Sequence, residues 1–358
     1  MKAVSILRPA AWAGVVTLVL GVQAALAEPL VYVPLGGEGK IVVIDAAKDE
    51  IVDTIGGVTA VHGLARTPDG QFLIAGSFEE REAGGEALAK PLGISEDEHA
   101  AHHGDSAAVA GKADSVVSTV SVVRTADGSL VRRIDVPGAV HHVATTPDGR
   151  YAILTHPNAG RVSVIDLKTY AIAATVHTGP SPNYAVISPD GSRVYVSNAG
   201  NDTVSELDPD RWIVRRNVVA GRSAGHMVMS RDGRWLYVAN VADGTVSEID
   251  TQGGSVFRTF KVGGLLHGID LSDDGRRLVV TARERNELVA INLHTWGIAR
   301  IPLGPAPYHI ASVGGTGKLY VSSANEPNVW VVDQKSLAVL GEIPIGGKGY
   351  QMVLSPGT

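Results

Sequence analysis

The chain has 358 residues and contains no cysteine. Disulfides, thiolate metal ligands and a covalently attached c-type haem are therefore excluded, because each of them needs cysteine sulfur. Aromatic residues make up only 5% of the chain, and the formal net charge of −6 gives no reason to expect nucleic acid or an anionic membrane as a partner. Stability must come from aliphatic burial and from backbone hydrogen bonds.

Long apolar runs are absent except at the N-terminus. Lys2 and Arg8 form a positive segment, residues 10–24 are apolar apart from Gln23, and "ALA" at residues 25–27 is a small-x-small cleavage site. This pattern predicts a secretory signal peptide cleaved after Ala27. The apolar stretch is short for a bilayer span. We therefore expect a periplasmic or secreted protein, residues 28–358, without a membrane anchor after cleavage.

A repeat of 42 residues runs through the chain. The turn position steps from Pro147 to Pro189, Arg231 and Asp273, and the segments around it align, as in "NYAVISPDGSRVYVSNAGNDTVSELDP" from Asn183. Each unit contains alternating apolar runs separated by Gly, Asn and Asp, which is typical of short β-strands. A period in this range with several strands per unit predicts a β-propeller.

Counting the units predicts an all-β fold with seven four-stranded blades in a single domain. The chain ends in "YQMVLSPGT" from Tyr350, which can form only an inner strand, and the mature chain begins with "LVYVPLGGEGKIVVID" from Leu30, which matches the second and third strands. The two ends together make the seventh blade. A blade shared in this way closes the ring and leaves no free sheet edge.

One unit is longer than the others. Pro68 and Pro147 are 79 residues apart, 37 more than the period, and the excess lies at about residues 79–114. This insertion contains "SEDEHAAHHGDS" and belongs to the same face of the ring as the starts of the inner strands, which we call the top face. Its potential metal ligands are His99, His102, His103 and Asp105. The segment is either a metal-capture loop or a solvated linker that happens to contain histidine.

Six of the twelve histidines stand at the start of inner strands, at the mouth of the central channel on the top face: His62, His141, His142, His226, His267 and His309. A histidine kept only for structure would hold one register, whereas these alternate between two adjacent positions. Imidazole is the commonest protein ligand of zinc and copper. The pattern therefore predicts a zinc or copper site, used for metal handling or delivery.

Other functions remain open at this point. Arg283 and Arg285 lie in a top-face loop and could hold a carboxylate. A zinc-dependent or lactonase-like hydrolase would need a carboxylate base, for which Glu284 and Glu326 are the candidates. No Ser–His–Asp triad is recognisable, so the sequence does not favour an enzyme. A scaffold that binds a periplasmic protein partner and no ligand is the remaining alternative.

Three second-to-third strand segments, "RVYVSNAGNDTVSELD", "WLYVANVADGTVSEID" and "KLYVSSANEPNVWVVD", resemble the YVTN propeller repeat. The resemblance covers nearly the whole mature chain and implies an exported or surface seven-bladed propeller. More distantly, the pattern is similar to the haem-binding propeller of cytochrome-type nitrite reductases, in which top-face histidines bind the tetrapyrrole. That similarity implies an alternative cofactor, a haem d1-type tetrapyrrole on the central histidines, with Arg283 or Arg285 on a propionate.

Overall fold

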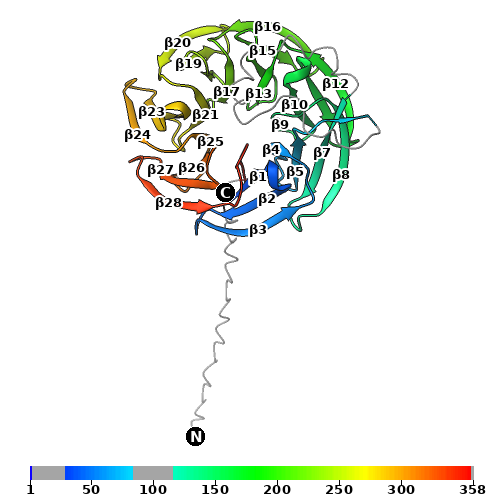
Figure 1. Cartoon of the computed structure of the whole chain (residues 1–358), viewed down its shortest axis with the longest axis horizontal. Coiled ribbons are helices and arrows are strands. Elements are labelled where there is room, and N and C mark those ends of the chain that lie inside the picture. Colours follow the sequence, from blue (N-terminus) through cyan, green and yellow to red (C-terminus); the bar gives the residue numbers. More distant parts are fainter. Residues whose placement is uncertain (2–28, 84–115, 356–358) are drawn as a thin grey trace.

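The structure is a computed structural model that describes, apart from Met1, residues 29–83 and 116–355. Its strands form a ring of seven antiparallel sheets around a central channel (Figure 1), as the repeat predicts. The segment predicted to be a signal peptide, and with it the cleavage site, lies outside the described residues. Among the residues that the structure describes, no helix is long and apolar enough to cross a membrane.

Four consecutive blades are complete and regular. From the inner to the outer strand they are β9 (Val143–Thr145), β10 (Tyr151–His156), β11 (Arg161–Asp166) and β12 (Ala171–His177); β13 (Pro182–Ile187), β14 (Val194–Asn198), β15 (Thr203–Asp208) and β16 (Ile213–Val219); β17 (Ala224–Met229), β18 (Trp235–Asn240), β19 (Thr245–Asp250) and β20 (Ser255–Lys261); β21 (Leu266–Leu271), β22 (Arg277–Ala282), β23 (Glu287–Asn292) and β24 (Ile298–Pro302).

The next blade along the chain has the same form, and the two blades that contain the chain ends and the insertion are less regular. Their strands are β25 (Pro307–Val313), β26 (Lys318–Ser323), β27 (Asn328–Asp333) and β28 (Val339–Pro344); β29 (Val353–Leu354), β1 (Leu30–Leu35), β2 (Lys40–Asp45) and β3 (Glu50–Gly56); β4 (Val61–Arg66), β5 (Phe72–Ser77), β7 (Val116–Arg124) and β8 (Leu130–Pro137), with the short β6 (Arg81–Glu82) beside β7.

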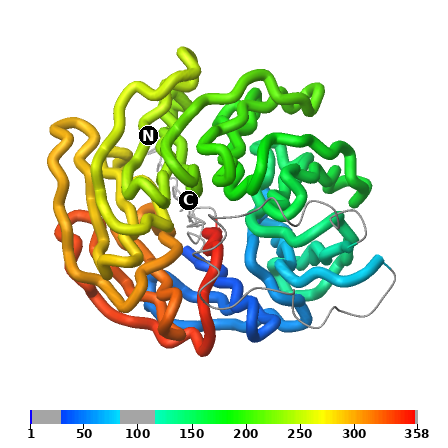
Figure 2. Tube along the Cα trace, turned by 45° about the horizontal axis from the view of Figure 1, so that its top comes forward, coloured from blue at the N-terminus to red at the C-terminus, as the bar shows by residue number. Residues whose placement is uncertain are grey.

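The ring is closed by the two ends of the chain, as predicted. Strand β29 pairs with β1, matching Val31 with Leu354, and the Leu30 amide donates to Ser355 Oγ at 2.8 Å. Figure 2 shows the C-terminal strand, in red, beside the N-terminal strands in blue. Closure leaves no inner strand unpaired, so no free edge is exposed at the channel.

The core lies between neighbouring blades. In the first such layer Val31 and Val33 of β1 pack with Tyr320 of β26 and Val331 of β27. Middle strands such as β14 and β18 are buried almost throughout, whereas the outer strand β16 is mostly exposed. Both faces of each sheet are therefore apolar in the middle strands, and the outer strand forms the surface of the ring.

The first turn of each blade is fixed by one repeated device. A Thr or Ser hydroxyl donates to an aspartate two residues later, as in Thr67 to Asp69 at 2.6 Å and Ser188 to Asp190 at 2.6 Å. These hydroxyl and backbone donors lower the pKa of each aspartate, that of Asp190 to about 2. The following Gly70 and Gly191 have positive φ, which only glycine adopts without strain. The "PDG" runs are thus the turns that the sequence predicts.

The predicted insertion begins with an ordered strand. Arg81 of β6 pairs with Val117 of β7, so the first residues of the 79–114 segment extend the sheet. Residues 84–115, and with them His99, His102, His103 and Asp105, lie outside the described residues.

A candidate metal centre at the mouth of the channel

The structure brings together the six histidines that the sequence predicts at the channel mouth. They come from β4, the segment just before β9, and strands β17, β21 and β25. Neighbouring ring centroids lie 4.4 Å apart for His62 and His141, 4.6 Å for His142 and His226, and 4.3 Å for His226 and His267. All of them except His267, which is partly buried, are buried. The rings therefore form one continuous cluster rather than isolated side chains.

Two groups of three histidines within this cluster have the spacing of a metal site. The first group is His62, His141 and His142, and the second is His142, His226 and His309. In each group the ligand nitrogens lie within 4.8 Å of one another. Tetrahedral zinc, with Zn–N bonds of about 2.0–2.1 Å, needs nitrogens about 3.4 Å apart. A small movement of the rings would therefore bring three nitrogens around one ion.

Backbone carbonyls set the tautomer of two of these imidazoles. His62 Nδ1 lies 2.7 Å from the His141 carbonyl oxygen, and His142 Nδ1 lies 2.8 Å from the Asn183 carbonyl oxygen. A carbonyl oxygen can only accept, so Nδ1 of each ring carries the proton and Nε2 carries the lone pair. A backbone carbonyl behind the ring is a common way of orienting a metal-binding histidine.

The cluster is electrically neutral when empty at neutral pH. Neither group of three contains a carboxylate. Burial, and secondly the neighbouring histidines, hold the pKa of His309 well below 6.5, and its Nε2 is buried with no hydrogen-bond partner among the described residues. His309 thus remains deprotonated at pH 7 with its lone pair toward the cluster, which is the state that a metal ion requires.

Tyrosine rings complete the wall around the histidines. Tyr308 stacks on His267 with centroids 3.8 Å apart, Tyr350 lies 4.4 Å from His62, and Tyr184 lies 4.7 Å from His226. Burial raises the pKa of Tyr184 to about 12, so its hydroxyl stays protonated. In the sequence Tyr184 and Tyr350 mark the blades that lack a histidine, and the structure shows that they occupy the same ring of positions.

Sequence reasoning missed the residue that closes the channel beneath these rings. The Gln351 side chain accepts hydrogen bonds from the amides of Leu64 (3.1 Å) and Val143 (3.2 Å), and it donates to the Val143 carbonyl at 3.0 Å. It thus ties the closing strand to two other blades. The sequence contains no signal for these bonds, because the partners lie 287 and 208 residues away.

The other predicted site residues lie at the rim. Arg283 and Arg285 form the short helix η4 (Arg283–Arg285), with the Arg283 guanidinium 5.7 Å from the Tyr308 ring centroid. Arg285 is exposed and lies against the loop at Gly263 and Gly264. Glu284 and Glu326 are also exposed and belong to neither histidine group, so neither is placed as the base of a hydrolase.

His156 provides a contrast within the same fold. It is fully buried, with Nδ1 3.0 Å from the Ala139 carbonyl oxygen and Nε2 2.9 Å from Ser163 Oγ. Asn198 occupies the equivalent place in the next blade and donates to Ser205 Oγ at 2.9 Å. Both ring nitrogens of His156 are used in holding its blade together, and burial lowers its pKa to about 4. This histidine is structural.

Comparison with known proteins supports the fold and the repeat. The model of the YNCE-like beta-propeller family matches residues 178–339. The uncharacterized protein YncE of Salmonella typhi is 40% identical over 70 residues, which is 20% of this chain and 20% of that protein. The match thus spans about a fifth of that relative, and it confirms the resemblance to this kind of propeller repeat.

Solved structures share the architecture at low identity. The periplasmic gluconolactonase PpgL of Pseudomonas aeruginosa has a TM-score of 0.70 and 18% identity, over 92% of this chain and 99% of that one. The dihydro-heme d1 dehydrogenase NirN in complex with DHE has a TM-score of 0.62 and 13% identity, over 88% of this chain and 63% of that one. At these identities the likeness shows the propeller fold alone.

Proposed function

We propose that this protein binds a transition-metal ion, zinc or copper, in the histidine cluster at the channel mouth, and that it handles or delivers the metal in the periplasm. One observation carries the proposal. Six imidazoles from five blades meet in one buried cluster, with two sets of three nitrogens close enough to share an ion. Neutral imidazole nitrogen suits zinc and copper.

The geometry favours one ion bound through His142 at a time. His142 belongs to both groups, and its Nδ1 is engaged by the Asn183 carbonyl, so only Nε2 can bind metal. The two groups therefore compete for the same lone pair. An ion held by three histidines keeps a fourth position for an incoming ligand. A ligand from a partner protein could enter there, which suits delivery.

A tetrapyrrole is the second candidate, favoured by the fold shared with NirN and by Arg283 near Tyr308. The histidine rings count against it. Their centroids are 4.2–5.7 Å apart for the pairs that His142 makes with His141, His226 and His309, so the rings are in mutual contact. A macrocycle would have to lie above the cluster, whereas a single ion fits within it.

The test is the element content of untagged protein purified from the periplasm, measured by mass spectrometry. We expect near-stoichiometric zinc or copper in the wild type and its loss in the double variant His142→Ala/His309→Ala. His294→Ala, which changes an exposed histidine in a loop on the opposite face, is the matched control and should retain the metal. Iron with a tetrapyrrole absorption band would support the second candidate. Protein that stays metal-free after incubation with zinc and copper would favour a protein-binding scaffold.

A further inference from the structure

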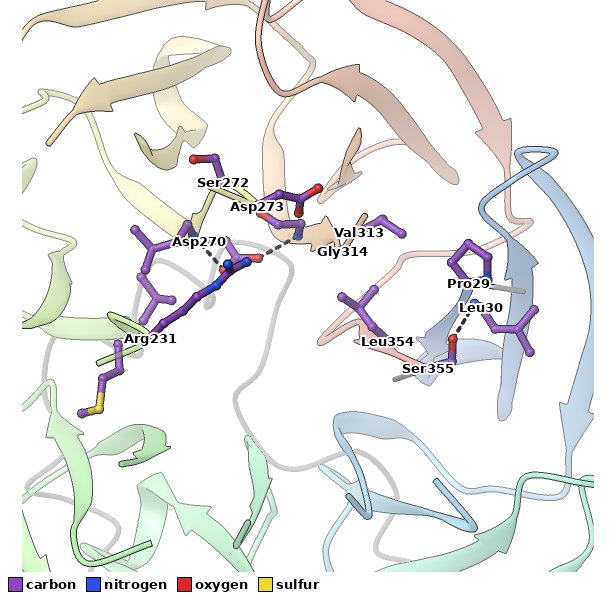
Figure 3. Close-up of a pocket in the computed structure, with 14 residues that line it drawn as sticks. Pro29, Leu30, Arg231, Asp270, Ser272, Asp273, Val313, Gly314, Leu354 and Ser355 are labelled. Atoms are coloured by element: carbon purple, nitrogen blue, oxygen red, sulfur yellow. Dashed lines mark hydrogen bonds between the residues drawn. The ribbon is translucent and has the colours of Figure 1, made fainter. Parts of the chain in front are cut away.

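A cavity of about 310 Å³ lies at the opposite end of the inner strands from the histidines (Figure 3). On β21, His267 is near the start of the strand and Asp270 is three residues further, or about 10 Å along an extended chain. The residues that matter for its chemistry are Val228, Met229, Arg231, Asp270, Val313 and Leu354. The cavity is therefore a separate site.

Asp270 breaks the repeat at this end of the channel. It pairs with Val279 on β22, and the residue at the same register position is apolar in five other blades. Those residues are Ala65, Ala144, Val186, Val228 and Ala311. A carboxyl group at this position is not needed to build a blade, because five blades form without it.

The Asp270 carboxylate is held in place by backbone groups. Oδ1 accepts from the Leu271 amide at 2.8 Å and Oδ2 accepts from the Ser312 amide at 2.7 Å. A carboxylate has about four lone-pair sites, so each oxygen can accept a further hydrogen bond. Among the described residues no cation forms an ion pair with it, and burial raises its pKa to about 6. The group is oriented and lacks a counter-charge.

Arg231 breaks the repeat beside it. The same turn position is proline in three other blades, at Pro68, Pro147 and Pro189. Arg231 lines the cavity, and Figure 3 shows its side chain extending over the side of the cavity where Asp270 lies. Its guanidinium forms no ion pair with any described residue. The two charged departures from the repeat thus meet in one cavity, whose remaining wall is largely aliphatic.

We propose that this cavity binds a small zwitterion of the α-amino acid type with an apolar side chain. Asp270 accepts hydrogen bonds from the ammonium group, Arg231 binds the carboxylate, and the aliphatic side of the cavity contacts the side chain. The volume is at the low end of the range for ligand pockets, about 300–1,000 Å³, which suits a single amino acid. This site does not depend on the proposed metal function.

The test is calorimetric titration of the mature protein with L-leucine and L-methionine. Two analogues of leucine each remove one charge: 3-methylbutylamine lacks the carboxylate and 4-methylpentanoate lacks the ammonium. We expect the amino acids to bind and each analogue to bind about tenfold to hundredfold more weakly, because each loses a charge-assisted contact. Asp270→Asn and Arg231→Gln should weaken leucine binding by a similar factor.

Matched controls keep the result specific. Asp53→Asn and Arg211→Gln change exposed residues elsewhere on the ring and should leave binding unchanged. Because amino acids also chelate metals, the titration is repeated with His142→Ala/His309→Ala, which should bind leucine as the wild type does. The proposal is overturned if neither amino acid binds at millimolar concentration, if an analogue binds as tightly as leucine, or if Asp270→Asn has no effect.

Discussion

The two ends of the central channel are built from the same inner strands and carry different chemistry. At the top, the strand starts bring six uncharged imidazoles together, and neither group of three contains a carboxylate. At the other end, one carboxylate and one guanidinium share an aliphatic cavity. The strand between is packed against neighbouring blades and varies little in character. The contrast teaches that the ends of the inner strands can change, because they face the channel mouths rather than the core between blades.

The two ends also respond to acid in opposite ways. Burial holds the pKa of His309 well below 6.5, so folding favours its neutral form and stability is lost as pH falls below about 6.5. Burial raises the pKa of Asp270 to about 6, so folding favours its protonated form and stability is lost as pH rises from about 4 to 6. Between pH 4 and 6.5 these two contributions oppose each other.

The largest effect that would break the comparison is loss of the top site alone. We expect His142→Ala/His309→Ala to weaken zinc or copper binding at least about hundredfold, because both variants remove ligands from the group that contains His226. The measurement is competition with a chromophoric chelator. The cavity at the other end should be unaffected, so an equal loss of amino acid binding would contradict the separation of the two sites.

Removing the bond that joins blades beneath the histidines should have the next largest effect. We expect Gln351→Ala to lower the free energy of unfolding by about 2–3 kcal/mol, because the buried Leu64 and Val143 amides lose their acceptor. Urea unfolding followed by circular dichroism measures this change. Gln334→Ala, whose side chain also joins neighbouring loops, is a comparison outside the channel. An unchanged midpoint for Gln351→Ala would show that the closing strand is held by β29 and β1 alone.

Asp270→Asn sharpens the electrostatic side of the comparison. We expect this variant to be more stable than the wild type by roughly 1–2 kcal/mol at pH 7.5, because it removes a buried charge, and the gain should vanish by about pH 4. The groups that bear on this carboxylate are Asp273, Arg231 and Tyr184. Thermal unfolding from pH 4 to 7.5 measures the difference. A gain that is the same at every pH would mean that charge is not its cause.

Arg283→Gln should have the smallest effect and separates the two candidate ligands. Its guanidinium lies over Tyr308 at the rim and touches neither group of three histidines. Metal affinity should change less than about threefold, since the charge is at the rim and screened by solvent. A much larger loss, measured on the protein with its natural ligand, would favour the tetrapyrrole, whose propionate this residue could hold.

Much of the architecture was predictable from local pattern. The 42-residue step, the "PDG" turns and the alternation of apolar residues predict seven four-stranded blades, and the unmatched ends predict the shared blade of β1 and β29. The histidines at the inner strand starts could be assigned to one face for the same reason. The prediction was possible because each blade repeats the same contacts at short range, so one unit describes the others.

The sequence by itself determined the ring, its closure and the face on which the histidines stand. Only the tertiary structure decided which nitrogens approach within 4.8 Å, which carbonyls hold His62 and His142, and that Gln351 lies under them. It also decided that Asp270 and Arg231, which follow different strands, share one cavity. The physical reason is that spacing along a repeat specifies a side chain's blade and height, whereas distances across the channel depend on ring closure and on contacts between residues hundreds of positions apart.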